Sequence, residues 1–394
     1  METTIMTLPR TELVKRAVEL GPWLRDHAQA AEDRRRLSED LLQALAGSGL
    51  LRMRVPLRYG GYESDMRTVT EVLAELARGD GSTAWTASVW LISSWMVGLF
   101  PDAVRDEVFA DPDVRISGIL SPGAMAVPAN GGYLVNGKWS FNTGAQHSDW
   151  NVNAAVRPTP DGQHEPVMVL FPMSDLQVID DWHTVGMRAS GSVTTVAKDV
   201  FVPAERVLPV GPVIGGAHPL QQDPAAPMWR APFMPIACTT VGAVAYGLAM
   251  AARDAFLERL PGSKITYTEY TEQSAAPLTH LQVAGAAIGV DEAGFHILRT
   301  ADLIDAKAAS GEPWSLEERA RARLDLGAVC LRAKEVVDVL AGASGGSSLY
   351  NDVPIQRIER DIKALNLHAI MHPDTNFELY GRLTCGLPSN TQYL

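Results

Sequence analysis

Residues 141–144 (Phe-Asn-Thr-Gly) place an aromatic ring, a hydroxyl and a glycine close together. A glycine leaves room for a ligand to approach the backbone, because it has no side chain. The Thr143 hydroxyl can hydrogen-bond a ring nitrogen or oxygen, and Phe141 can pack against a flat heterocycle. The segment therefore indicates a surface for a planar ligand, although an ordinary hairpin can have the same residues.

Three other segments combine hydroxyls with glycine or aromatic residues. The candidate residues in them are Leu120, Ser121, Trp182, Ser190, Ser192, Gly345, Gly346 and Ser347. Successive backbone N–H groups in the glycine- and serine-rich loop at 342–350 can form an anion-binding nest. Two alternatives stay open, because Ser-Pro-Gly at 121–123 also suits a strand-exit turn and Trp182 also suits a core.

Two histidines, His368 and His372, lie four residues apart near the C-terminus, which on a helix would place them on one face. A histidine with an ordinary pKa near ~6.5 can take a proton from a phenol at neutral pH or donate a hydrogen bond. We expect no metal at this pair, because no glutamate-rich or cysteine-rich segment is available to complete a ligand set. A histidine satisfied inside the core is the alternative for His368.

The elements that would position these residues fall into three blocks. Residues 9–111 show helical spacing, residues 113–208 show strands separated by turns, and residues after 228 are helical again. We therefore predict a mainly α-helical protein with a central β-domain. The predicted domains are an N-terminal helical domain at 1–112, a β-barrel or sandwich at 113–210 and a four-helix bundle at 211–394. The bundle helices are expected at 233–260, 277–309, 315–342 and 355–386, with a break in the last one at Pro373.

The segments at 138–150 and 182–192 resemble the flavin-contacting segments of the acyl-CoA dehydrogenase superfamily. They are most similar to its monooxygenase branch, and the pair Arg360-Asp361 resembles the closing signature of the superfamily. The resemblance implies an acyl-CoA dehydrogenase-like fold and a two-component flavin-dependent monooxygenase. Such an enzyme uses O₂ and reduced FMN or FAD from a separate NAD(P)H:flavin reductase, and it hydroxylates a small aromatic molecule through a flavin C4a-hydroperoxide. It further implies a homotetramer.

The resemblance also implies roles for individual residues. Thr143 matches the residue that bonds flavin N5, and His368 matches a catalytic histidine that faces the substrate. The other implied flavin contacts are Leu120, Ser121, Phe141, Trp182, Ser190 and Ser192, with Gly345, Gly346 and Ser347 reaching the flavin of a neighbouring subunit. Trp90 and His372 are our candidates for the substrate pocket.

One position argues against a dehydrogenase. The dehydrogenases commonly place their catalytic glutamate where this chain has Ala369, and alanine cannot abstract a proton next to a thioester. Three alternatives stay open: a dehydrogenase or oxidase with its base on another helix, an N-oxygenase of an amine, and a catalytically silent binding protein.

Composition limits the partners. The 394 residues carry a net charge of −12, and no basic run is present, so we expect neither nucleic acid nor an anionic membrane as a partner. Residues 1–20 lack the apolar run of a secretory signal, and we expect no membrane span. We therefore expect a cytoplasmic protein.

Overall fold

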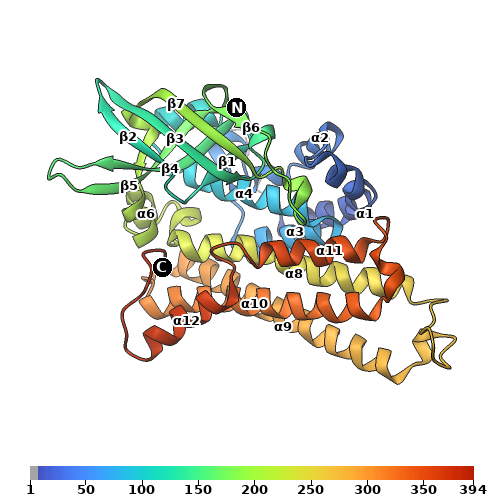
Figure 1. Ribbon diagram of the computed structural model, residues 1–394. Coiled ribbons are helices and arrows are strands. Elements are labelled where there is room, and N and C mark those ends of the chain that lie inside the picture. Colours follow the sequence, from blue (N-terminus) through green and yellow to red (C-terminus); the bar gives the residue numbers. More distant parts are fainter. Residues whose placement is uncertain (1–7) are drawn as a thin grey trace.

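The computed structural model describes residues 8–394. The N-terminal part is helical, with α1 (Arg10–Arg34), α2 (Glu39–Ser48), α3 (Met66–Gly79), α4 (Gly81–Val97) and α5 (Asp102–Val108). Asp80 caps α4, because its carboxylate accepts from the backbone N–H of Thr83 at 2.8 Å. Nearly every residue of α4 is buried, so this helix lies inside the molecule, between the sheet and the C-terminal helices (Figure 1).

Eight strands form one sheet in the middle of the chain. They are β1 (Ile116–Ile119), β2 (Ala124–Ala129), β3 (Gly132–Asn142), β4 (Trp150–Pro158), β5 (His164–Pro172), β6 (Gln177–Ile179), β7 (Val193–Pro203) and β8 (Val207–Pro209). The strand order is β6-β7-β3-β2-β4-β5-β8, and β1 pairs with β4 in parallel. The central pair β3–β7 is antiparallel, and its pairing is shifted between Trp139 and Asn142. This irregularity lies directly before Thr143, where the candidate site begins.

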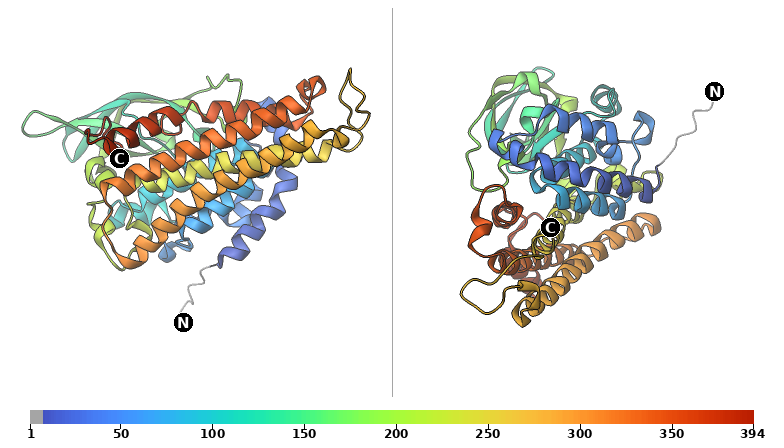
Figure 2. Two further views of the ribbon diagram at one scale, coloured as in Figure 1. Left: turned by 90° about the horizontal axis from the view of Figure 1, so that it is seen from below. Right: turned by 90° about the vertical axis from the view of Figure 1, so that its right-hand side faces the viewer.

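The C-terminal part is a helical bundle. After two short helices, α6 (Val210–Gly215) and α7 (Pro219–Gln222), it contains α8 (Phe233–Arg259), α9 (Pro277–Ser310), α10 (Leu316–Ala343), α11 (Pro354–Leu365) and α12 (Pro373–Thr384). Figure 2 shows the long helices α8, α9 and α10 running side by side. Together with the central sheet, this gives the mainly helical architecture that the sequence predicts.

Helix α8 is the centre of the bundle. It is the one helix among residues 8–394 that is long and apolar enough to cross a membrane, but 94% of its most apolar window is buried inside the protein. Its neighbours α3, α4, α9, α10 and α11 cover it. The apolar character of α8 therefore serves the protein core.

The last bundle helix is interrupted before Pro373. Helix α11 ends at Leu365, and Pro373 is the first residue of α12, where a missing backbone N–H costs nothing. His368 and His372 lie in the turn between them, with the His372 N–H donating to the His368 carbonyl at 3.1 Å. The expectation that both histidines share one helix face is therefore wrong, because the chain leaves the helix before it reaches them.

Candidate active site

Thr143 follows a strained turn at the end of β3. Phe141, one of the last residues of the strand, has φ of +64°, a conformation that an aromatic residue adopts only when its surroundings impose it. The shifted pairing with β7 accompanies this conformation, which leaves Phe141 66% exposed while Thr143, two residues on, is buried. The turn thus separates a ring at the surface from a hydroxyl in the interior.

Thr143 belongs to a row of hydrogen-bonded groups. Trp85 Nε1 donates to its hydroxyl at 3.1 Å, and the Thr143 and Ser192 hydroxyls are 2.8 Å apart. The row continues through the Ser190 hydroxyl, 2.8 Å from that of Ser192, to the Met187 carbonyl, which accepts from Ser190 at 2.7 Å. Helix α4, the end of β3 and the segment before β7 therefore meet at one point.

Two aromatic rings lie beside this row at the surface. Phe141 and Trp182 contact each other edge to face, with ring centroids 5.9 Å apart. The Trp182 indole is held in place by its Nε1, which donates to the Met187 carbonyl at 3.0 Å. This pair, with Phe141 exposed and Trp182 half-buried, lies next to inward-facing hydroxyls and suits one edge and one face of a planar heterocycle.

His368 approaches the same place from the turn between α11 and α12. Its ring packs edge to face on Trp85, with centroids 5.1 Å apart. Burial lowers the pKa of His368 to about 4, so the imidazole is neutral at physiological pH. Nδ1 accepts from the Ile370 N–H at 3.4 Å, which assigns the single ring proton to Nε2. His368 therefore presents an N–H donor.

Asp361 in α11 anchors the loop that carries Met187. Its carboxylate accepts from the Met187 N–H at 2.5 Å, and Met187 itself has φ of +52°. Burial, with the nearby Asp80 carboxylate, raises the pKa of Asp361 to about 7. One buried acid thus holds both strained Met187 and, through it, the serine hydroxyls.

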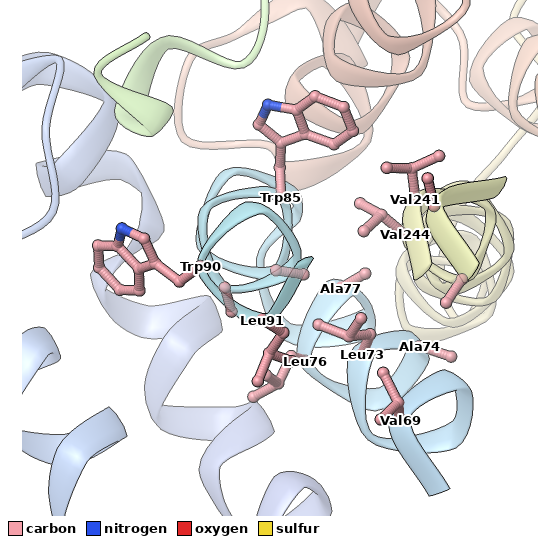
Figure 3. Close-up of a cluster of buried hydrophobic side chains, with 14 of the residues drawn as sticks. Val69, Leu73, Ala74, Leu76, Ala77, Trp85, Trp90, Leu91, Val241 and Val244 are labelled. Carbon is pink, nitrogen blue, oxygen red and sulfur yellow. The ribbon is translucent and has the colours of Figure 1, made fainter. Parts of the chain in front are cut away.

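Several predicted site residues lie elsewhere. Trp90 leaves α4 on another side than Trp85 (Figure 3), is 1% exposed and donates to the Ser148 hydroxyl at 3.0 Å, so it belongs to the core. Leu120 and Ser121 follow the end of β1, half-buried and exposed respectively. The His372 side chain is partly buried, and its Nδ1 has no hydrogen-bond partner among residues 8–394. The structure does not bring these four side chains into the row of hydroxyls.

The loop with Gly345, Gly346 and Ser347 lies at the other end of α11 from His368. Helix α11 has 12 residues, which corresponds to about 18 Å at 1.5 Å per residue. Added Cβ atoms at Gly345 and Gly346 would meet nothing within 4 Å, so both backbones are open to a ligand, and Arg259 donates to the Ser347 hydroxyl at 3.2 Å. In this chain the loop is therefore too far from Thr143 to contact the same end of a ligand.

No carboxylate among the described residues hydrogen-bonds Thr143, Ser192 or His368. Ala369 is exposed, and the nearest glutamate along α11, Glu359, accepts from Lys363 at 2.7 Å. Within residues 8–394, no three His, Cys, Asp or Glu side chains gather as they would around a metal ion. The groups that meet here are hydroxyls, indoles and one imidazole, so no carboxylate takes the place of the catalytic glutamate of a dehydrogenase.

Sequence reasoning missed two of the connections. Asp361 is 174 residues from Met187, and its only sequence signal was its place in the Arg360-Asp361 pair. Trp85 lies five residues before Trp90, the predicted pocket residue, but the sequence pattern says nothing of the hydrogen bond from Trp85 to Thr143. Both contacts depend on the tertiary packing of distant segments.

Two family models match the chain. They describe the N-terminal domain of acyl-CoA dehydrogenase, over residues 17–103, and its C-terminal domain, over residues 239–373. The flavin-dependent monooxygenase oxygenase subunit HsaA of Rhodococcus jostii (strain RHA1) is 32% identical, over 95% of this chain and 98% of its own length. The chain belongs to the acyl-CoA dehydrogenase superfamily, in its flavin-dependent monooxygenase branch. This confirms the predicted resemblance.

A solved structure and a further relative agree with this assignment. XiaF from Streptomyces sp., in complex with FADH2 and glycerol, superposes with a TM-score of 0.91 at 32% identity and covers 97% of each chain. The FADH(2)-dependent resorcinol hydroxylase, oxygenase component, of Rhizobium sp. (strain MTP-10005) is 28% identical over 98% of this chain and 97% of its own length. The superfamily member described here thus has an acyl-CoA dehydrogenase-like fold and is a flavin-dependent monooxygenase.

Proposed function

We propose that this protein is the oxygenase component of a two-component monooxygenase that hydroxylates a phenol or a related small aromatic molecule. Its partner would be a separate NAD(P)H:flavin reductase, which delivers reduced flavin. The observation that carries the proposal is the row of hydrogen-bonded groups from Trp85 through Thr143 to Ser192, which lies between the Phe141–Trp182 pair and the neutral His368. When bound, reduced flavin supplies the electrons that activate O₂.

The residues present fit a flavin. The exposed Phe141 ring and the half-buried Trp182 ring offer a surface for the isoalloxazine. The strained turn holds Phe141 there, and the hydrogen bond to the Met187 carbonyl holds Trp182. Thr143 keeps one free lone pair after accepting from Trp85, and this lone pair suits the N5 hydrogen of a reduced flavin. We propose that the Ser192 hydroxyl, beside that of Thr143, is the second hydroxyl that faces the N5 edge of the flavin.

His368 would act as a hydrogen-bond donor to the substrate oxygen. A neutral ring with its proton on Nε2 cannot accept a second proton at Nε2, so the resting imidazole does not act as a base for a phenol. It stabilises negative charge on the substrate oxygen and fixes the orientation of the ring that is hydroxylated. Trp85, on which His368 packs, holds it in this position.

Reduced FAD is our preferred cofactor. The sequence resemblance left reduced FMN and reduced FAD open, but XiaF is solved with FADH2 and the resorcinol hydroxylase is named for it. The open backbone at Gly345 and Gly346, with Arg259 beside it, suits the diphosphate of FAD bound in a neighbouring subunit. Anaerobic titration of the protein with reduced FMN and with reduced FAD would show which flavin binds more tightly.

We also propose a homotetramer. Leu281, Ile288 and Phe295 recur every seven residues along α9 and are 60–74% exposed, which is the spacing of a helix–helix seam. A groove of about 640 Å³ runs beside this seam between α9 and α10. Such an exposed apolar face favours burial against another copy of the chain.

A reconstituted assay tests the proposed activity. The protein is combined with an unrelated NADH:flavin reductase, FAD and a panel of phenols, indoles and amines under ¹⁸O₂. We expect one labelled oxygen in a phenolic product. The His368→Ala variant is expected to give about 10²-fold less product while flavin oxidation continues, because the donor is lost.

Other results of this assay would point elsewhere. Turnover of an acyl-CoA thioester without a reductase would support the dehydrogenase or oxidase reading. A product with the labelled oxygen on the nitrogen of an amine would support an N-oxygenase. Product formation by His368→Ala at the wild-type rate would contradict the role of this histidine.

A further inference from the structure

The row of hydroxyls at Thr143 can be given a direction. Its two ends have fixed roles, since an indole Nε1–H can only donate and a carbonyl oxygen can only accept. Trp85 Nε1 stands at one end, 3.1 Å from the Thr143 hydroxyl, and the Met187 carbonyl stands at the other, 2.7 Å from the Ser190 hydroxyl. Each of the three hydroxyls between them has one hydrogen.

Only one arrangement places a hydrogen in every contact of the row. Ser190 must give its hydrogen to the Met187 carbonyl, so the contact between Ser190 and Ser192 uses the hydrogen of Ser192. The 2.8 Å contact between Ser192 and Thr143 then uses the hydrogen of Thr143. The reverse direction would leave two oxygens 2.7 Å apart at Met187 with no hydrogen between them. Thr143 therefore has no hydrogen left for a ligand.

We propose that Ser190 is a positioning residue that, through Ser192, holds the Thr143 hydroxyl as a hydrogen-bond acceptor toward flavin N5. This rests on the proposed function. Reduced flavin carries a hydrogen on N5, whereas oxidised flavin has only a lone pair there, so an acceptor favours the reduced form. Ser190 is 1% exposed and both of its hydroxyl contacts are internal, which places it behind Ser192 and away from the flavin contact that its sequence position implied.

The acceptor end of the row is rigidly held. Met187 has φ of +52°, and its N–H is fixed by Asp361 from another domain. Its carbonyl also accepts from Trp182 Nε1, so the peptide cannot rotate without breaking several hydrogen bonds. The protein therefore sets the direction of the hydrogen bonds in the row, and a bound flavin meets Thr143 as an acceptor.

The test compares the affinities of oxidised and reduced FAD for the intact protein under anaerobic conditions. Wild type is expected to prefer reduced FAD. Ser190→Ala removes the contact that fixes the direction, so Thr143 can turn and donate. We expect the preference to fall about tenfold, as for the loss of one buried hydrogen bond. A tenfold change corresponds to about 30 mV in the two-electron potential of the bound flavin.

Three controls separate this role from a structural one. Ser190→Thr restores a hydroxyl and should restore the preference. Trp85→Phe removes a donor but leaves the direction set by Met187, so the preference should change less than in Ser190→Ala. Reduced 5-deaza-FAD has carbon in place of N5 and no N–H there, and its affinity should be the same in wild type and Ser190→Ala. If Ser190→Ala does not fold, Ser192→Ala interrupts the same row and should show the same loss.

Two results would overturn the proposal. One is an unchanged preference for reduced FAD in a folded Ser190→Ala protein. The other is equal affinity of wild type for reduced FAD and reduced 5-deaza-FAD. Failure of wild type to bind either flavin in either state would instead overturn the proposed function, and this inference with it.

Discussion

At the scale of single residues, we propose that the site works through hydrogen bonds of fixed direction. His368 donates from Nε2 because Nδ1 is occupied by the Ile370 amide, and Thr143 accepts because its hydrogen is used by Ser192. The sequence resemblance named both residues, but it could not assign donor and acceptor. Those roles follow from neighbours such as Trp85, which lies 58 residues from Thr143 along the chain.

His368 is expected to remain neutral throughout the physiological range. Its folded-state pKa, about 4, is below the ordinary value near ~6.5, so protonation destabilises the folded protein. Stability linked to this group is present above about pH 6.5 and is lost as the pH falls toward 4. NMR of ¹⁵N-histidine-labelled protein should show an Nε2–H tautomer at pH 6. A midpoint near pH 6.5 for this ring would contradict the burial described here.

At the scale of elements, much of the helical structure could be predicted from the sequence. The apolar periodicity of α8, α9 and α10 placed their ends within two residues, and Pro373 marked the break before α12. The strand β2 could not be predicted in this way, because Met125 and Val127 face solvent while Ala126 faces the core, which reverses the usual pattern. Contacts between distant elements could not be predicted either, because the local sequence does not encode which loop contacts α11.

The contact between α11 and the loop before β7 should be intolerant of added volume. A Cβ atom at Gly186 would lie 2.2 Å from the Arg360 carbonyl oxygen, which is backbone and cannot move aside. We expect Gly186→Ala to lower the free energy of unfolding by roughly 2 kcal/mol or more and to weaken flavin binding. Gly342→Ala, in the last turn of α10 with nothing within 4 Å, is the matched control and should be neutral or slightly stabilising. Equal urea midpoints for the two variants would contradict this packing.

Asp361, which joins the same two elements, should make stability depend on pH. Its folded-state pKa is raised to about 7, so the folded protein keeps this proton between about pH 4 and 7 while the unfolded chain loses it. Stability from this group therefore falls as the pH rises through that window. Asp361→Asn cannot ionise but still accepts from the Met187 N–H, and it should be more stable than wild type at pH 8 by roughly 1–4 kcal/mol.

The control for Asp361 is its replacement by alanine. Asp361→Ala leaves the Met187 N–H without an acceptor and should destabilise the protein at both pH 5 and pH 8. Urea unfolding at the two pH values measures each variant. Equal stability of Asp361→Asn and wild type at pH 8 would mean that ionisation of the buried carboxyl does not destabilise the folded protein.

At the scale of the whole molecule, the order of helical domain, sheet and bundle could be predicted, and domain boundaries near residues 112 and 210 remain our proposal. Packing of the three parts places α4 between the sheet and α8, where Trp85 reaches both Thr143 and His368. The exposed seam on α9 lies on the bundle. The molecule thus separates its chemistry from the face that we assign to assembly.

Disruption of that seam should dissociate the proposed oligomer without unfolding the chain. The double variant Leu281→Glu/Ile288→Glu places two charges on the exposed face of α9 and should reduce the mass measured by light scattering to that of a smaller assembly. Val18→Glu changes an exposed apolar residue on α1 and is the control, with no expected change in mass. A wild-type protein that is monomeric, or an unchanged mass for the double variant, would contradict the proposed interface.

The most direct test of the central claim follows the reaction of the reduced, flavin-loaded protein with O₂. Protein and photoreduced FAD are mixed without oxygen and then exposed to O₂ in a stopped-flow spectrometer. The site described here predicts a transient absorbance in the near ultraviolet, distinct from reduced and oxidised flavin, that appears before oxidised FAD forms. A single-phase return of oxidised FAD at the rate of free flavin would contradict the assignment of this protein as a monooxygenase component.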